Sequence, residues 1–157
     1  MELNFQIALE SDCDTLVELV GEYHEFERIP FDKSEIRRAL KDLLRDRTLG
    51  RAWLIRDGTV AVGYLVLCFG FSLEFLGRDA FIDEFFIRSS HRGRGWGRKA
   101  MQHVEEDARA LGVQAIHLEE SGRGSAARPL YEKMGYKKRD YALMTKRIGG
   151  NNPESAN

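Results

Sequence analysis

A segment rich in both glycine and arginine is the part of the chain whose residue types point most directly to chemistry. It follows a strand-like run, precedes a helical pattern, and reads His91-Arg92-Gly93-Arg94-Gly95-Trp96-Gly97-Arg98-Lys99. Alternate glycines allow backbone turns that expose successive N–H groups, and the start of a helix adds unpaired N–H groups and partial positive charge. Together with the basic side chains, these features are typical of a phosphate site. A tight surface turn is the alternative.

Two other kinds of phosphate-binding loop do not fit this segment. A dinucleotide fingerprint, Gly-x-Gly-x-x-Gly, fails because counting from Gly93 puts Arg98 at the third glycine position, and counting from Gly95 puts Ala100 there. A Walker loop requires a Gly-Lys pair, and the chain contains none. The sequence therefore gives no support for hydrolysis of a nucleoside triphosphate.

Two adjacent acids, Asp83 and Glu84, interrupt an otherwise apolar run at residues 80–87. Because neighbouring side chains in a strand point to opposite faces, one of the two should face a site. Partial burial would raise the pKa of that acid and make it a better base. Glu84 is the preferred candidate; alternation groups it with Ile82 and Phe86, although a β-bulge here would exchange the faces. The structural alternative is a carboxylate paired with a nearby arginine.

Hydrophobic spacing indicates the elements that must position these residues. Alternation or dense apolar character predicts strands at about 5–9, 51–56, 59–69, 80–87, 113–118 and 136–145. Helical spacing predicts four helices. Three lie at about 14–26, 95–111 and 126–134, and another begins after Ser34 as its N-cap. Asp57-Gly58 predicts a tight hairpin turn between the second and third strands. This order of elements describes an α/β domain around one mixed sheet.

Composition sets the broad class of the protein. The chain has 157 residues, 43% of them apolar, which suits one domain with one core. The net charge of -1 gives no pull toward nucleic acid. The N-terminus lacks a leader pattern and the longest apolar-plus-glycine run, 12 residues, is too short to span a bilayer, so we expect a cytoplasmic protein without a membrane partner. Two cysteines and four scattered histidines predict no metal site, and apolar neighbours argue against Cys68 as a nucleophile.

Two motifs resemble those of a known family. Arg92-x-x-Gly95-x-Gly97, between a strand and a helix, resembles the acetyl coenzyme A signature of the GNAT N-acetyltransferase superfamily. Downstream, Ala127-Arg128-Pro129-Leu130-Tyr131 and the following residues to Tyr136 are similar to the family's second motif. The resemblance implies an acetyltransferase domain at 1–148 with a twisted, mixed, mostly antiparallel sheet of six to seven strands and about four helices. A polar, disordered tail at 149–157 would follow it.

The resemblance also implies roles for particular residues. Acetyl-CoA would be the co-substrate, with its pyrophosphate on the loop Arg92 to Arg98 and its pantetheine amides on backbone groups of Phe85, Phe86 and Ile87. Glu84, or Asp83 in its place, would take the proton of an attacking amine, directly or through water. Tyr131 would donate a hydrogen bond or proton to the departing thiolate.

Two residues depart from the usual pattern of the family. Trp96 stands where a smaller aliphatic residue is common, and Gly124 replaces an asparagine three residues before the motif alanine. Trp96 should alter packing at the cofactor helix, and Gly124 removes a side chain that positions cofactor or backbone in relatives. These departures favour the alternative of a non-catalytic acyl-CoA sensor or binding module.

An uneven charge distribution bears on the acceptor. The segment 10–35 carries nine acids and two bases, a local sum of -7. Because the first two helices would flank the acceptor cleft, an acidic lining there would concentrate a small cationic amine such as a polyamine or a lysine-like amino acid. A solvated helix face, and a protein or peptide acceptor, are the alternatives. Relatives often dimerise, so a homodimer is expected.

Overall fold

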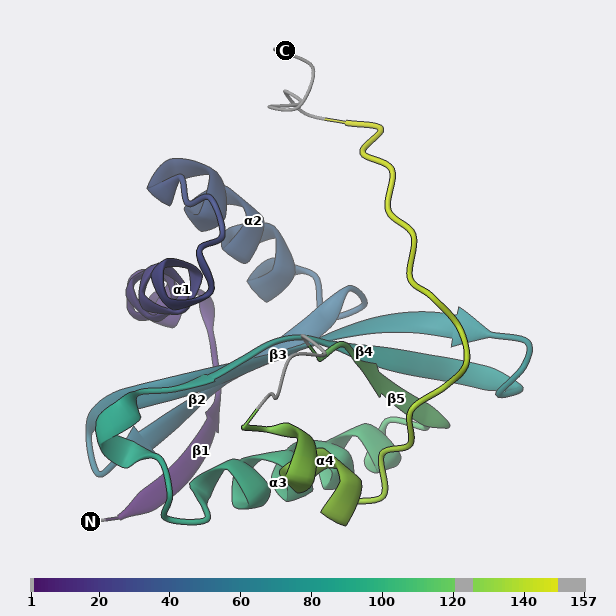
Figure 1. Ribbon diagram of the computed structural model, residues 1–157. Helices are drawn as coiled ribbons and strands as arrows, with labels where there is room; N and C mark the ends of the chain where they lie inside the picture. The colour runs from purple at the N-terminus through teal and green to yellow at the C-terminus, as the bar shows by residue number, and fades with distance from the viewer. Residues whose placement is uncertain (1, 121–125, 150–157) are drawn as a thin grey trace. The chain divides into compact units, whose positions relative to one another are not determined.

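A five-stranded sheet organises residues 2–120 of the computed structural model, which describes residues 2–120 and 126–149 (Figure 1). The strands and longer helices of this part are, in chain order, β1 (Leu3–Ile7), α1 (Cys13–Glu27), α2 (Lys33–Arg45), β2 (Gly50–Asp57), β3 (Val60–Ser72), β4 (Gly77–Ile87), α3 (Trp96–Ala110) and β5 (Ala115–Leu118). Two short 3-10 turns, η1 (Glu10–Asp12) and η2 (Ser89–His91), precede α1 and follow β4.

The strands lie in the order β1-β2-β3-β4-β5. The first three pairings are antiparallel, and β4 and β5 are parallel. A parallel pair needs a long crossover connection, which α3 supplies between β4 and β5. The predicted mixed, mostly antiparallel α/β architecture is therefore confirmed.

The predicted count of six to seven strands is too high. The segment 136–145, predicted as a last strand, forms no ladder in the described part of the chain. Its aromatic and apolar residues suit a strand, but a strand also needs a neighbour for its backbone N–H and C=O groups. By its contacts the chain divides into two compact units, Met1–Arg123 and Gly124–Asn157, and the described helix of the second unit is α4 (Arg128–Lys133).

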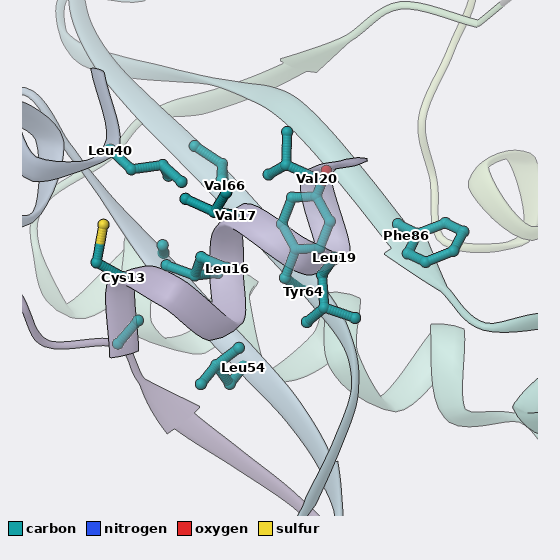
Figure 2. Close-up of a cluster of buried hydrophobic side chains, with 12 residues drawn as sticks. Cys13, Leu16, Val17, Leu19, Val20, Leu40, Leu54, Tyr64, Val66 and Phe86 are labelled. Atoms are coloured by element: carbon teal, nitrogen blue, oxygen red, sulfur yellow. The ribbon is translucent and has the colours of Figure 1, made fainter. Parts of the chain in front are cut away.

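Helices cover both faces of the sheet in the first unit (Figure 1). On the face called here the α1 face, α1 and α2 pack on alternate residues of β2, β3 and β4. Figure 2 shows part of this cluster, where Leu16 and Val20 of α1 meet Tyr64 and Val66 of β3. On the other face, called here the α3 face, Trp96 and its helix pack on β2 and β3.

Local signals explain most of the element boundaries. The predicted β2–β3 hairpin is confirmed, but its two turn residues are Gly58, at φ +58°, and Thr59, because Asp57 still pairs with Val60. The second helix begins slightly earlier than Ser34 suggests: the carboxylate of Asp32 accepts hydrogen bonds from the backbone N–H groups of Ser34 and Glu35. No helix in the described ranges is both long and apolar enough to cross a membrane.

Replacing Leu16 by alanine should destabilise the protein strongly. Leu16 is 0% exposed in the α1-face core, so its truncation leaves a cavity and should cost about 2–5 kcal/mol in the free energy of unfolding. Leu73 is 84% exposed, and Leu73→Ala should change that free energy by no more than about 0.5 kcal/mol. Urea unfolding of the two variants measures the difference, and equal midpoints would contradict this core assignment.

Candidate active site

The edge of β4 that faces β5 is covered along only part of its length. The two strands pair from Asp79 to Ile82 on β4, opposite Ala115 to Leu118 on β5. Between Asp83 and Ile87 no other strand in the described ranges pairs with this edge. Backbone groups there can receive an extended ligand with amide groups, in the way that a sheet edge receives an added strand.

The same place in β4 carries a β-bulge on the side of β3. Val66 pairs with Glu84, whereas the next residue, Leu67, pairs with Ile82, so Asp83 is an extra residue in β4. Directly paired residues share a face of the sheet, and Val66 belongs to the α1-face core. Glu84 therefore also lies on the α1 face. Ile82 lies on the opposite face, although simple alternation groups it with Glu84.

Glu84 is held by side chains from two other elements. Its Oε1 lies 2.5 Å from Nε2 of His24, in the last turns of α1. Its Oε2 accepts a hydrogen bond of 2.6 Å from the phenol of Tyr64, on β3. His24 and Tyr64 are both buried, and the Glu84 side chain is 18% exposed. One carboxylate thus connects α1, β3 and β4 and keeps some access to solvent.

Asp83 differs from its neighbour in accessibility and surroundings. Its residue surface is exposed. Desolvation by surrounding atoms, followed by the negative charges of Glu84 and Glu119, raises the pKa of the Asp83 carboxyl, and His24 opposes these effects. The charges of both adjacent acids also raise the pKa of the Tyr64 phenol, after the larger effect of its burial. The bulge thus leaves both carboxylates close to the same group, where alternation predicts opposite faces.

Cys68 does not have the properties of a nucleophile. Burial, and then the charges of Asp83 and Glu84, raise the pKa of its thiol to about 11. A thiol with so high a pKa is almost entirely protonated at neutral pH, and the thiolate is the reactive form. This agrees with the expectation from sequence that Cys68 is not a catalytic group.

The glycine loop leads from the end of β4 into α3. Gly93 and Gly95 have φ angles of +75° and +76°, a conformation that glycine adopts at little cost. Gly95 is the N-cap of α3, and its C=O accepts a hydrogen bond from the N–H of Lys99. The N–H groups of Trp96, Gly97 and Arg98 belong to the first turn, which has no intrahelical partners for them. The loop therefore has the backbone form that an anion site requires.

Two side chains of this loop that were predicted to bind the cofactor have partners within the protein. The Arg92 guanidinium donates from Nε to the C=O of Ile87 at 2.6 Å and lies over the rings of Phe26 and Phe86. The Trp96 side chain is buried in the α3-face core. Arg92 thus ties the loop to the end of β4, and the indole of Trp96 anchors the start of α3. Arg98 is exposed, as a phosphate-binding side chain should be.

Tyr131 belongs to the second unit and lies on α4. Its backbone N–H donates to the C=O of Ala127, and its own C=O accepts from the N–H of Tyr136. The two tyrosine rings meet edge to face, with centroids 6.0 Å apart. The predicted helix thus positions Tyr131 together with the aromatic residue after the helix. Gly124, the second departure from the family pattern, lies outside the described residues.

His24 and Tyr64 are site residues that the sequence reasoning missed. One signal for His24 exists: it continues the buried stripe of α1, four residues after Val20, and a buried polar side chain on such a stripe needs a partner. Nothing in the sequence indicates that this partner is 60 residues further along. Among the described residues no group of three or more His, Cys, Asp or Glu side chains could hold a metal ion.

The acidic segment 10–35 is largely neutralised by neighbouring bases. Five of its nine acids form ion pairs with arginines: Glu10–Arg45, Asp12–Arg56, Asp14–Arg37, Glu22–Arg88 and Glu35–Arg38. Asp32 caps α2. The local sum of -7 thus overstates the negative field that this segment presents. Carboxylates around the bulge, on Asp83, Glu84 and Glu119, form a more compact acidic group.

Comparison with known proteins defines the class. The family model described as "Acetyltransferase (GNAT) family" matches residues 14–136. A solved structure titled an integron cassette protein, from the mobile metagenome of Cole Harbour Salt Marsh, is 33% identical with a TM-score of 0.84. The match covers 94% of this chain and 91% of the chain of that structure. The chain therefore belongs to the GNAT acetyltransferase family, as its two motifs predict.

Particular relatives are more distant or partial. An uncharacterized N-acetyltransferase, YycN of Bacillus subtilis, is 29% identical over 44% of each chain, so the match spans less than half of that relative. Thialysine N-epsilon-acetyltransferase of Bos taurus is 25% identical over 82% of this chain and 80% of its own. A predicted acetyltransferase of Clostridium acetobutylicum, solved with acetyl-CoA, has the same fold at 20% identity and a TM-score of 0.78, covering 92% and 96% of the two chains.

Asp83→Asn should change stability in a pH-dependent way. The raised pKa means that the folded state binds a proton on Asp83 more tightly than the unfolded state does. Protonated Asp83 therefore favours folding below the unfolded pKa of about 3.9, and this contribution is lost as the pH rises through the folded pKa. We expect Asp83→Asn to raise Tm at pH 8 more than at pH 4. A larger gain at pH 4, in thermal scans of both proteins, would contradict this assignment.

Gly95→Ala should destabilise the loop through backbone strain alone. A Cβ built on Gly95 meets no atom within 4 Å, but its φ of +76° is costly for alanine, by about 1–2 kcal/mol. Asparagine tolerates this conformation better, so Gly95→Asn should cost less. We expect the free energy of unfolding, measured in urea, to be highest for the wild type, lower for Gly95→Asn and lowest for Gly95→Ala. If alanine is tolerated as well as asparagine, the positive φ is not required.

Proposed function

We propose that the chain transfers an acetyl group from acetyl-CoA to a primary amine of a small cationic acceptor, by direct attack within a ternary complex. The observation that carries this proposal is the coincidence at Asp83 and Glu84. There β5 stops pairing with β4, the bulge begins, and a fixed carboxylate stands next to a backbone edge that no described strand pairs with. Membership of the GNAT acetyltransferase family supports the reaction class.

The residues present fit acetyl-CoA, whose thioester supplies the activated acetyl group. Backbone groups of Phe85, Phe86 and Ile87 would bind its amides along the free edge, and could polarise its carbonyl. N–H groups of the loop 93–97 would bind its phosphates, with Arg98 adding charge. Arg92 and the Trp96 indole would contribute by holding the loop in shape, since both side chains have other partners.

Glu84 would accept the proton of the acceptor amine, directly or through a water molecule. An alkyl ammonium with a pKa near 10.4 is about one part in a thousand neutral at pH 7.4, a deficit of roughly 4 kcal/mol. A carboxylate that is fixed in place and partly shielded from solvent can lower this barrier as a general base. Asp83, more exposed and with a raised pKa, is the second candidate for this role.

Tyr131 would donate a hydrogen bond or a proton to the thiolate that leaves when the tetrahedral intermediate collapses. A thiol has a reference pKa near 8.5 and a phenol near 10, so the phenol can supply a proton without being ionised itself at neutral pH. The support for this role is the resemblance of residues 127–136 to the family's second motif, within the range 14–136 that the family model matches.

A small cationic amine is the acceptor class that the charges favour. The acids around the bulge, Asp83, Glu84 and Glu119, would attract an ammonium group more directly than the paired acids of segment 10–35. A relative named for N-epsilon acetylation of thialysine supports an amino-acid-like acceptor. A protein or peptide acceptor is the alternative. The homodimer and the cytoplasmic location stay predictions.

Acetyl-CoA and a panel of amines test the proposed reaction, with released thiol as the readout. Polyamines and lysine-like amino acids should support turnover, and short peptides should be poorer acceptors. Glu84→Gln should lower kcat about 10²–10⁴-fold and leave acetyl-CoA binding by calorimetry unchanged. The exposed α1 carboxylate offers a matched control, Glu18→Gln, which should retain activity. Full activity of Glu84→Gln would exclude Glu84 as the base, and a greater loss in Asp83→Asn would transfer the role to Asp83.

Tyr131→Phe tests the proposed proton donor. Loss of the Tyr131 hydroxyl should lower kcat at least tenfold. Tyr141 is an exposed tyrosine in the same unit, and Tyr141→Phe should leave kcat unchanged. Tight acetyl-CoA binding without turnover of any amine in the wild type would instead favour the non-catalytic sensor. Burial of the Trp96 indole in the core weakens one argument for that alternative, because this departure then affects packing and not the site.

A further inference from the structure

Both carboxylate oxygens of Glu84 have hydrogen-bond partners among the described residues. His24 Nε2 is 2.5 Å from Oε1, and the Tyr64 phenol donates to Oε2 at 2.6 Å. A glutamate has three side-chain torsions, so an exposed one samples many orientations. Two partners from different elements restrict these orientations to one.

The location of the proton on His24 follows from its other ring nitrogen. Nδ1 is buried, and no described residue provides it with a hydrogen-bond partner. A proton on Nδ1 would leave a buried N–H donor unsatisfied, which is costly, and an imidazolium would add a charge to that cost. The favoured form is therefore a neutral ring with its proton on Nε2, so that His24 donates and an ionised Glu84 accepts.

Aromatic rings hold the imidazole in this orientation. Tyr23, next in α1, meets the His24 ring edge-on at 5.9 Å between centroids, and Phe31, after α1, does so at 6.0 Å. Tyr23 also packs edge-on against the ring of Tyr64. The two donors to Glu84 thus stand in one packed group, and each limits the movement of the other.

We propose that His24 and Tyr64 are positioning residues, which fix the Glu84 carboxylate in the orientation needed to take up the proton of the acceptor amine. This inference rests on the proposed function. Each carboxylate oxygen has further lone-pair capacity beyond its one donor, and the Glu84 side chain is 18% exposed, so the carboxylate can still accept a proton. Neither residue touches substrate in this scheme, so both act through Glu84 alone.

A pair of amide substitutions separates positioning from packing. In His24→Gln the amide lies near the place of Nε2 and can still donate to Glu84, whereas in His24→Asn it lies near the place of Nδ1 and cannot. The two side chains have the same chemistry and no charge. His24→Gln should keep kcat within about threefold of the wild type. His24→Asn should lower kcat at least tenfold, with KM for acetyl-CoA unchanged in both.

Tyr64→Phe provides an independent arm of the test. It preserves the ring in the α1-face core and removes only the donor to Oε2. We expect a loss in kcat of at least fivefold, again with KM for acetyl-CoA unchanged. All assays are run below the measured Tm of each variant, so that unfolding does not lower the apparent kcat.

The outcomes distinguish the two proposals. The positioning role is supported if the wild type turns over, His24→Gln keeps its kcat, and both His24→Asn and Tyr64→Phe lose kcat. Wild-type turnover with equal kcat in the two His24 variants, or with no loss in Tyr64→Phe, overturns the positioning role and leaves the proposed function standing. Absence of turnover with every amine in the wild type overturns the proposed function, and the positioning role with it.

Discussion

A single residue of β4, Asp83, marks the point at which both neighbouring ladders change. On one side β5 pairs with β4 as far as Ile82, and on the other side the register with β3 shifts between Val66 and Leu67. An extra residue in a strand bends it and redirects the side chains that follow. Here the bulge brings Glu84 to the α1 face, where it meets His24 and Tyr64. The edge of β4 that no described strand covers and the fixed carboxylate therefore begin at the same place in the strand.

The rest of the fold supports this point from both faces of the sheet. On the α1 face, α1 places His24 against Glu84, and its apolar stripe is buried over β3. On the α3 face, Trp96 and Ala100 pack with Ile55 and so fix the start of α3, where the glycine loop ends. Arg92 joins the two regions, since it contacts the last residue of β4 and an exposed ring of α1. Carboxylate and loop are thus positioned by the same strand.

Local patterns predicted the fold well and part of the site. The Asp57-Gly58 hairpin, the amphipathic α3 and the glycine loop depend on near neighbours in the sequence, and all three are present. The His24–Glu84 contact joins residues 60 positions apart, so no local pattern contains it. The sequence allows a bulge at Asp83-Glu84 but does not show that one is present, because the bulge arises from the register between β4 and β3. The segment 136–145 has strand-like residues, yet a strand also depends on a partner, which composition does not supply.

Charge counting along the sequence overstates the negative field of segment 10–35 for a related reason. A sum over segment 10–35 records nine acids but not the arginines of α2, β2 and the end of β4 that neutralise five of them. Ion pairs form between elements, so the sign of a surface depends on folding as well as on sequence. The acids at the bulge were visible as a sequence feature because the strand that carries them is otherwise apolar.

The protonation of His24 tests the central claim most directly, because the fixed carboxylate depends on an Nε2–H donor. Nitrogen-15 NMR of the histidine-labelled chain at pH 8, with the His24 signals assigned by their absence in His24→Gln, measures it. We predict a neutral ring with its proton on Nε2, and a change in the Nε2 resonance in Glu84→Gln. A proton on Nδ1, or a His24 ring that does not respond to Glu84→Gln, would contradict this account of the site.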